Sequence, residues 1–163
     1  MPMRVLVFGN PLLPEDSVPL KLIPKLRKKF PKVDFVESDP EELEHESAKG
    51  QLTIIDTVKG IKAVTVLTEK DIDKFELCGK CSVHDFDLSW TLRILRKMGL
   101  VNEVWIVGVP RGMKEAVALE AVAKSLSSVL RSPRKAHRTG RRRTPALLML
   151  SEIARGTKPS RHW

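Results

Sequence analysis

Cysteine is scarce in this chain of 163 residues: only Cys78 and Cys81 occur, three positions apart. Two such cysteines cannot build the disulfide framework of a small secreted domain, so we expect a reducing, cytoplasmic environment. No apolar run approaches the roughly 18 residues of a membrane-spanning helix. The opening sequence MPMRVLVF lacks the basic region, apolar stretch and small-residue cleavage site of a signal peptide. We therefore expect a soluble cytoplasmic protein with no membrane partner.

Acidic residues are nearly missing from one end of the chain. Residues 132–163 hold nine Lys and Arg against the single acid Glu152, whereas residues 1–131 hold 20 basic and 19 acidic residues. A basic tail can bind nucleic acid through counterion release, but this one has no aromatic side chain for base stacking before Trp163. We expect a domain over 1–131 and a flexible basic extension over 132–163, with at most a short helix at 144–156, and no nucleic-acid partner.

Apolar patterning along residues 1–131 alternates between strand and helix. Strands are predicted at 3–8, 33–38, 52–56, 62–67 and 103–109, and helices at 16–26, 88–98 and 115–130. The strand at 62–67 follows a short turn after Gly60 and is expected to be antiparallel at an edge, while 75–86 is expected to be irregular. Strands separated by helices predict an α/β fold: a three-layer sandwich with a mainly parallel, twisted sheet of the phosphorylase/hydrolase-like kind and right-handed crossovers. There is no internal repeat.

Polar residues follow several of the predicted strands, where ligands bind in parallel sheets. Asn10 and Asp16 follow the first strand, Asp56 ends the third, His84 lies in the loop before a helix, and Gly108–Gly112 follow the last strand. Two carboxylates and an imidazole that converge at one edge would form an O,O,N site with open positions, suited to a divalent ion such as nickel or zinc.

Each of the three residues also has a structural interpretation. Asp16 could cap the following helix, a role worth about 1 kcal/mol. Asp56 could form a turn at the end of its strand, and a single histidine such as His84 is usually a surface or structural residue. The spacing alone does not decide between these roles and a metal site.

Four segments together resemble a known family. GNPLLPEDSVP (9–19) resembles the pattern G-N-x-L-x-x-D-[DE]-x-x-G that opens the hydrogenase maturation endopeptidases. LTIIDTV (52–58) resembles the family's apolar strand ending in aspartate, CSVHDFDLSWTLRIL (81–95) its histidine segment leading into a helix, and VWIVGVP (104–110) its last strand. The similarity spans roughly residues 3–130 in the expected order.

The resemblance implies a definite activity. Members of this family remove a C-terminal peptide from the large-subunit precursor of nickel–iron hydrogenases after nickel has been inserted. By position, Asp16, Asp56 and His84 would recognise nickel that arrives with the precursor, with Asn10 and Glu15 behind them. The precursor is then the expected partner, and we expect the protein itself to be a monomer. The catalytic residue is not identified: Asp16 and Asp56 are candidates, and no Ser-His-Asp grouping is legible.

Several residues depart from the family pattern. Pro19 stands where the family has glycine, and Glu15 where it often has aspartate. Cys78 and Cys81 fall outside the pattern; they are loop thiols, a redox pair, or part of a zinc site with His84. The competing hypothesis is a non-catalytic module that binds a metal, or nucleic acid through the tail.

Overall fold

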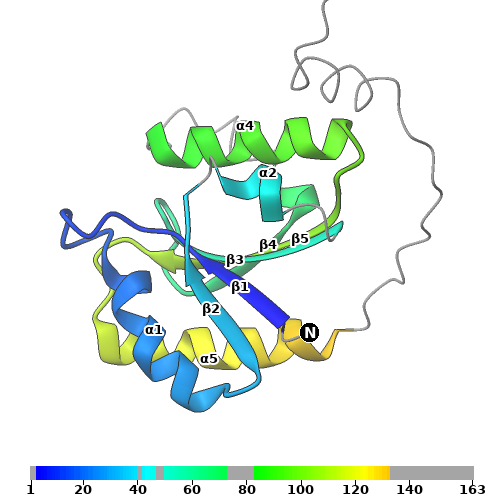
Figure 1. The fold of residues 1–163 in the computed structure, drawn as a ribbon. Helices are drawn as coiled ribbons and strands as arrows, with labels where there is room; N and C mark the ends of the chain where they lie inside the picture. Colours follow the sequence, from blue (N-terminus) through cyan, green and yellow to red (C-terminus); the bar gives the residue numbers. More distant parts are fainter. Residues whose placement is uncertain (1–2, 40–41, 47–49, 73–82, 133–163) are drawn as a thin grey trace, which may run out of the picture. The chain divides into compact units, whose positions relative to one another are not determined.

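The computed structural model describes residues 3–39, 42–46, 50–72 and 83–132 (Figure 1). Its strands are β1 (Met3–Val7), β2 (Val33–Glu37), β3 (Gly50–Val58), β4 (Thr65–Thr68) and β5 (Val101–Pro110). Its helices are α1 (Val18–Lys29), α2 (Leu43–Glu46), α4 (Val83–Lys97) and α5 (Glu115–Arg131). No helix in these ranges is long and apolar enough to cross a membrane.

The five strands form one sheet in the order β2-β1-β3-β5-β4. All neighbours are parallel except β4, which lies at an edge and runs antiparallel to β5. In Figure 1, α2 and α4 cover one face of the sheet, and α1 and α5 cover the other. The predicted three-layer, mainly parallel α/β fold is therefore confirmed, as is the antiparallel edge strand. The neighbour of that edge strand is β5, which inserts between β3 and β4.

Apolar residues on both faces of the central strands explain their unbroken apolar sequence. Along β1, Val5 and Val7 pack into the core beneath α1 and α5, whereas Leu6 packs into the core beneath α4. The same alternation continues in β3 with Ile55 and Ile54. Each fully buried aliphatic side chain contributes about 1.5–3 kcal/mol by leaving water. A strand covered on both faces must therefore be apolar at consecutive positions.

Helix α1 begins two residues later than the sequence predicted. Its buried face contains Leu22, Ile23 and Leu26, whereas Leu20 is only partly buried. Pro19 lies in the first turn, where the missing N–H carries no penalty. Pro24 lies inside the helix on its exposed side and removes one backbone hydrogen bond there.

Several boundary predictions are wrong, among them the start of the edge strand, which begins at Thr65 and not at residue 62. The predicted irregular segment at 75–86 is helical from Val83 onward, so His84 lies in the first turn of α4 and not in a loop. Asp56 does not end β3, which continues to Val58, and Gly108 lies within β5. Short apolar runs define where a strand is but not where it stops, because pairing with neighbours extends strands through polar residues.

The buried face of α4 explains most of the apolar spacing that predicted a helix at 88–98. Leu88, Leu92 and Leu95 are buried against the sheet, but Met98 lies beyond the end of the helix and is 40% exposed. Gly99 follows with a φ of +70°, a left-handed conformation that glycine adopts freely at a helix end.

Two sets of predictions fall outside the described residues. One concerns Cys78 and Cys81, and the other concerns the tail, including its helix at 144–156. The described part of the chain ends at Ser132, one residue after α5. The division into a domain and an extension therefore stays a prediction.

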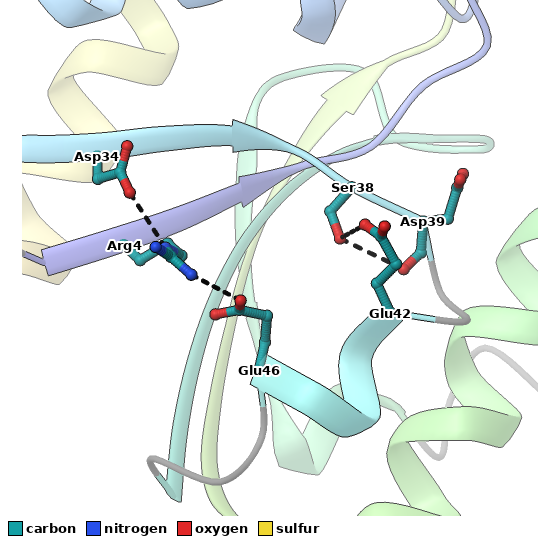
Figure 2. Close-up of polar contacts among 6 residues, drawn as sticks. All are labelled: Arg4, Asp34, Ser38, Asp39, Glu42 and Glu46. Carbon is teal, nitrogen blue, oxygen red and sulfur yellow. Dashed lines mark hydrogen bonds and ion pairs between the residues drawn. The ribbon is translucent and has the colours of Figure 1, made fainter.

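Arg4 joins three elements at the start of β1 (Figure 2). Its Nε donates to Asp34 Oδ2 on β2 at 3.1 Å, and its Nη1 donates to Glu46 Oε1 on α2 at 2.7 Å. The hydrogen bond with Glu46, followed by the one with Asp34, raises the pKa of Arg4 above its ordinary value. At the other end of β2, the Ser38 hydroxyl donates to Glu42 Oε2 at 2.9 Å. These contacts attach the short helix α2 to the sheet.

Candidate functional site

The candidate site lies where the chain leaves β1 and β3, two neighbouring parallel strands. After β1 the chain enters α1 on one face of the sheet, whereas after β3 it forms the edge strand β4 and then α4 on the opposite face (Figure 1). Because the two connections diverge, the carboxyl ends of β1 and β3 form a topological switch point, the usual ligand-binding position in sheets of this kind.

The β1–α1 loop is organised by hydrogen bonds around Asn10. The Asn10 side-chain oxygen Oδ1 accepts from Leu12 N–H at 2.9 Å, and its carbonyl accepts from Leu13 N–H at 3.1 Å. Asp16 N–H donates to the Leu13 carbonyl at 2.9 Å. An asparagine that bonds the backbone two residues on stabilises a tight turn. These hydrogen bonds give the loop a defined backbone conformation.

Asp16 closes this loop with its side chain. Its Oδ2 accepts from Asn10 N–H at 3.1 Å, while Oδ1 has no hydrogen-bond partner in the described part of the chain. The residue at the helix cap position is Ser17, which makes no side-chain capping bond. Asp16 thus does not cap α1, and one carboxylate oxygen stays available beside the positive end of the helix dipole.

Gly9 permits this arrangement by lacking a side chain. A Cβ atom at position 9 would lie 2.6 Å from the Asp16 carbonyl oxygen and 3.1 Å from Leu20 Cγ. Backbone atoms cannot yield as a flexible side-chain end can. A glycine at this position therefore allows the loop to fold back until Asp16 reaches the end of β1.

Asp56 lies two positions before the end of β3, the strand beside β1. The residue is only 8% exposed, and its Oδ1 accepts from Thr57 N–H at 2.8 Å. Strand alternation places Asp56 on the same face as Ile54, the face covered by α2 and α4. It pairs across the sheet with Gly108 of β5. Asp56 is therefore a buried strand residue and not a turn-former.

Topology places the start of α4 at the same edge of the sheet. The helix ends at Lys97, and β5 begins four residues later at Val101, at the amino end of the parallel strands. The first turn of α4, which contains His84, must then lie toward their carboxyl ends. The side chain of His84 is outside the described part of the structure. Among the described residues, no three His, Cys, Asp or Glu residues are grouped so that they could hold a metal ion.

The sequence did not indicate one contact at this edge. Arg111, in the turn after β5, donates from Nη2 to Glu15 Oε1 at 2.8 Å. The only feature that could have suggested it is the position of residues 108–112 after the last strand, at the edge shared with the β1–α1 loop. Partners 96 positions apart in the chain are not visible in the local sequence.

Comparison with solved structures gives the class of fold. The hydrogenase maturating endopeptidase HybD from E. coli superimposes with a TM-score of 0.56 at 22% identity, covering 78% of this chain and 90% of that one. The hydrogenase 3 maturation protease gives a TM-score of 0.52 at 18% identity, covering 75% and 87%. An uncharacterised protein from Wolinella succinogenes gives 0.51 at 16% identity, covering 80% and 99%.

No family model matches the chain, and no curated protein matches it. The similarity to the solved structures is therefore detected from the fold. The chain has the α/β fold of the hydrogenase maturation endopeptidases.

Proposed function

We propose that this protein is an endopeptidase that removes the C-terminal extension of a nickel–iron hydrogenase large-subunit precursor after nickel insertion. The observation that carries the proposal is the pair of aspartates at the switch point of a fold shared with hydrogenase maturation endopeptidases. Asp16 leaves one carboxylate oxygen without a partner among the described residues, at the end of the strand beside the one that carries Asp56. A nucleotide site would instead place phosphate-binding glycines and a cation there.

In this proposal the nickel ion belongs to the substrate. It arrives held by cysteine thiolates of the precursor, and Asp16, Asp56 and His84 supply oxygen and nitrogen ligands to its open positions. Position 84 precedes Leu88 by one helical turn, and Leu88 packs against the sheet on the face to which Asp56 belongs. The bound metal would polarise the scissile carbonyl or activate a water molecule. Asn10 holds the Asp16 carboxylate through its N–H, and Glu15 holds the loop from the other side.

The test compares two forms of one substrate. Purified protein is incubated with nickel-loaded and with nickel-free precursor, and release of the C-terminal peptide is followed by mass spectrometry. We expect cleavage of the loaded form only, because three protein ligands leave a divalent site incomplete until the substrate thiolates join it. Equal cleavage of the two forms would contradict nickel recognition, and cleavage of neither would contradict the peptidase activity.

His84→Ala provides the matched variant for the same assay. It removes the proposed nitrogen ligand from the first turn of α4, and the folded state can be checked by circular dichroism. We expect loss of processing with an unchanged spectrum. A wild-type protein that binds the nickel-loaded precursor without cutting it would favour the non-catalytic, metal-handling alternative.

A further inference from the structure

The turn after β5 holds the loop that carries Asp16. Pro110, Arg111, Gly112 and Met113 form a four-residue turn in which Met113 N–H donates to the Pro110 carbonyl at 3.1 Å. Gly112 has a φ of +75° at the third position, a conformation that favours glycine there. The turn places Arg111 at its corner and points the Gly112 N–H out of the turn.

Both of these groups bond to a single residue, Glu15. Arg111 Nη2 lies 2.8 Å from the Glu15 carboxylate, and Gly112 N–H donates to the Glu15 carbonyl at 3.3 Å. Glu15 directly precedes Asp16 in the chain. A side-chain bond and a backbone bond to the same residue restrict both its position and its rotation.

These contacts cross a strand that carries the other aspartate. The two connections that meet belong to β1 and β5, which flank β3 in the sheet. On one side, Asp16 is held by the hydrogen bond from Asn10 N–H to its carboxylate. On the other, it is held by the preceding residue Glu15, which is bound to Arg111. The spacing between Asp16 and Asp56 depends on both supports, because a loop fixed at one point can still pivot.

The same ion pair contributes little to holding the fold together. The Arg111 and Glu15 side chains are 34% and 45% exposed, and pairs of that exposure are screened by water and salt. The chain offers a control with no connection to the site: Lys29 of α1, 41% exposed, pairs at 2.9 Å with the more exposed Glu120 of α5, far along the helices.

From this geometry we infer that Arg111 is a positioning residue, which holds Asp16 through Glu15 at the spacing needed to meet a metal ion in the substrate. The inference deepens the proposed function and rests on it, since the metal ion belongs to the proposed precursor. Arg111 itself does not touch the substrate.

The experiment compares Arg111→Met with Lys29→Met in the full-length protein. For nickel-loaded precursor, we expect kcat/KM to fall about tenfold in Arg111→Met, since small misplacements of a reacting group are costly. Lys29→Met should match the wild type, and both variants should melt at nearly the wild-type temperature. Arg111→Lys, which keeps the charge and one donor, should restore most of the activity.

A second measurement separates positioning from the proposed activity. The Asn10 N–H is held by the Asp16 carboxylate, so its hydrogen-exchange rate, measured by NMR, reports whether Asp16 stays in place. We expect faster exchange in Arg111→Met and unchanged exchange in Lys29→Met and Arg111→Lys. If the wild type cleaves nothing, the proposed function fails while this measurement still decides the role of Arg111. Unchanged exchange in Arg111→Met, or activity lost only in step with the melting temperature, would overturn the inference.

Discussion

At the start of β1, Arg4 lies between the carboxylates of Asp34 and Glu46 and bonds to both. In the loop that follows the same strand, the Asp16 carboxylate accepts a backbone N–H and forms no ion pair with any described residue. Both places hold acidic side chains in a protein with an excess of base. At the first, the opposite charges lie together and the contact joins secondary-structure elements. At the second, the negative charge is held in place, but no cation among the described residues pairs with it, which suits a site for a cation from outside.

The largest expected effect separates these two kinds of carboxylate. Asp16→Asn should abolish processing of the nickel-loaded precursor. Removing a residue that only supports a metal ligand typically costs about 10–100-fold in activity. The loss in Asp16→Asn should be larger, because the proposed ligand itself loses its charge. The amide oxygen can still accept the Asn10 N–H, so the loop should keep its structure.

Asp34→Asn is the matched control for that substitution. It removes a carboxylate paired with Arg4, and we expect processing at the wild-type rate. Peptide release is measured for both variants under the same conditions. If Asp34→Asn were as inactive as Asp16→Asn, the contrast between the two ends of β1 would be wrong.

A smaller effect is expected from crowding the loop at the end of β1. Gly9→Ala would place a Cβ 2.6 Å from the Asp16 carbonyl oxygen, so the loop must shift. We expect a free energy of unfolding lower by about 1–3 kcal/mol, the usual cost of overpacking, together with impaired processing. Urea denaturation measures the first and peptide release the second.

Gly99→Ala gives the comparison for this variant. Gly99 has a φ of +70° and nothing within 4 Å of the added Cβ, so alanine there costs only backbone strain. It should destabilise the protein without affecting processing by the folded fraction. A Gly9→Ala protein with wild-type stability would show that the loop is more adaptable than its hydrogen bonds indicate.

A smaller loss still is expected at the start of β1. Arg4→Met keeps the apolar stem but removes the bonds to Asp34 and Glu46, so α2 loses part of its attachment to the sheet. We expect a lower melting temperature, by less than Gly9→Ala causes, and unchanged processing. The pKa of Arg4 is raised, so its contribution would be lost only as pH rises through that raised value, far above any assay. The shift in melting temperature should therefore be the same at pH 7 and pH 9.

The smallest expected effect concerns Glu115 at the start of α5. The hydrogen bond from Lys25, at 2.6 Å, lowers the pKa of the Glu115 carboxyl. A lowered pKa contributes stability that is present above the unfolded-state pKa, about 4.3 for glutamate, and disappears as pH falls through the folded-state value. The melting-temperature difference between wild type and Lys25→Met should therefore be largest near pH 6 and vanish toward pH 2. A difference that grows on acidification would contradict this assignment.

The likeness to the hydrogenase maturation endopeptidases was visible in short segments, but it is the fold that bears it out. The order of strands and helices followed from the period of apolar residues, since a strand covered on both faces must be apolar throughout. The strand-end rule also placed the Asn10–Asp16 loop and Asp56 at one edge, because parallel strands bring their carboxyl ends together. Residue 84 reached that edge as well, in a helix and not in the predicted loop.

The sequence by itself determined the layers, the parallel sheet and the chain positions of the candidate ligands, because these depend on local apolar periodicity and on which residues follow each strand. Only the tertiary structure decided that β5 inserts between β3 and β4, that Asp16 bonds to Asn10 and does not cap α1, and that Arg111 reaches Glu15. These features join residues through space. The packing of whole strands and helices decides which of many similar surface charges come into contact. A local sequence pattern holds no information about that packing.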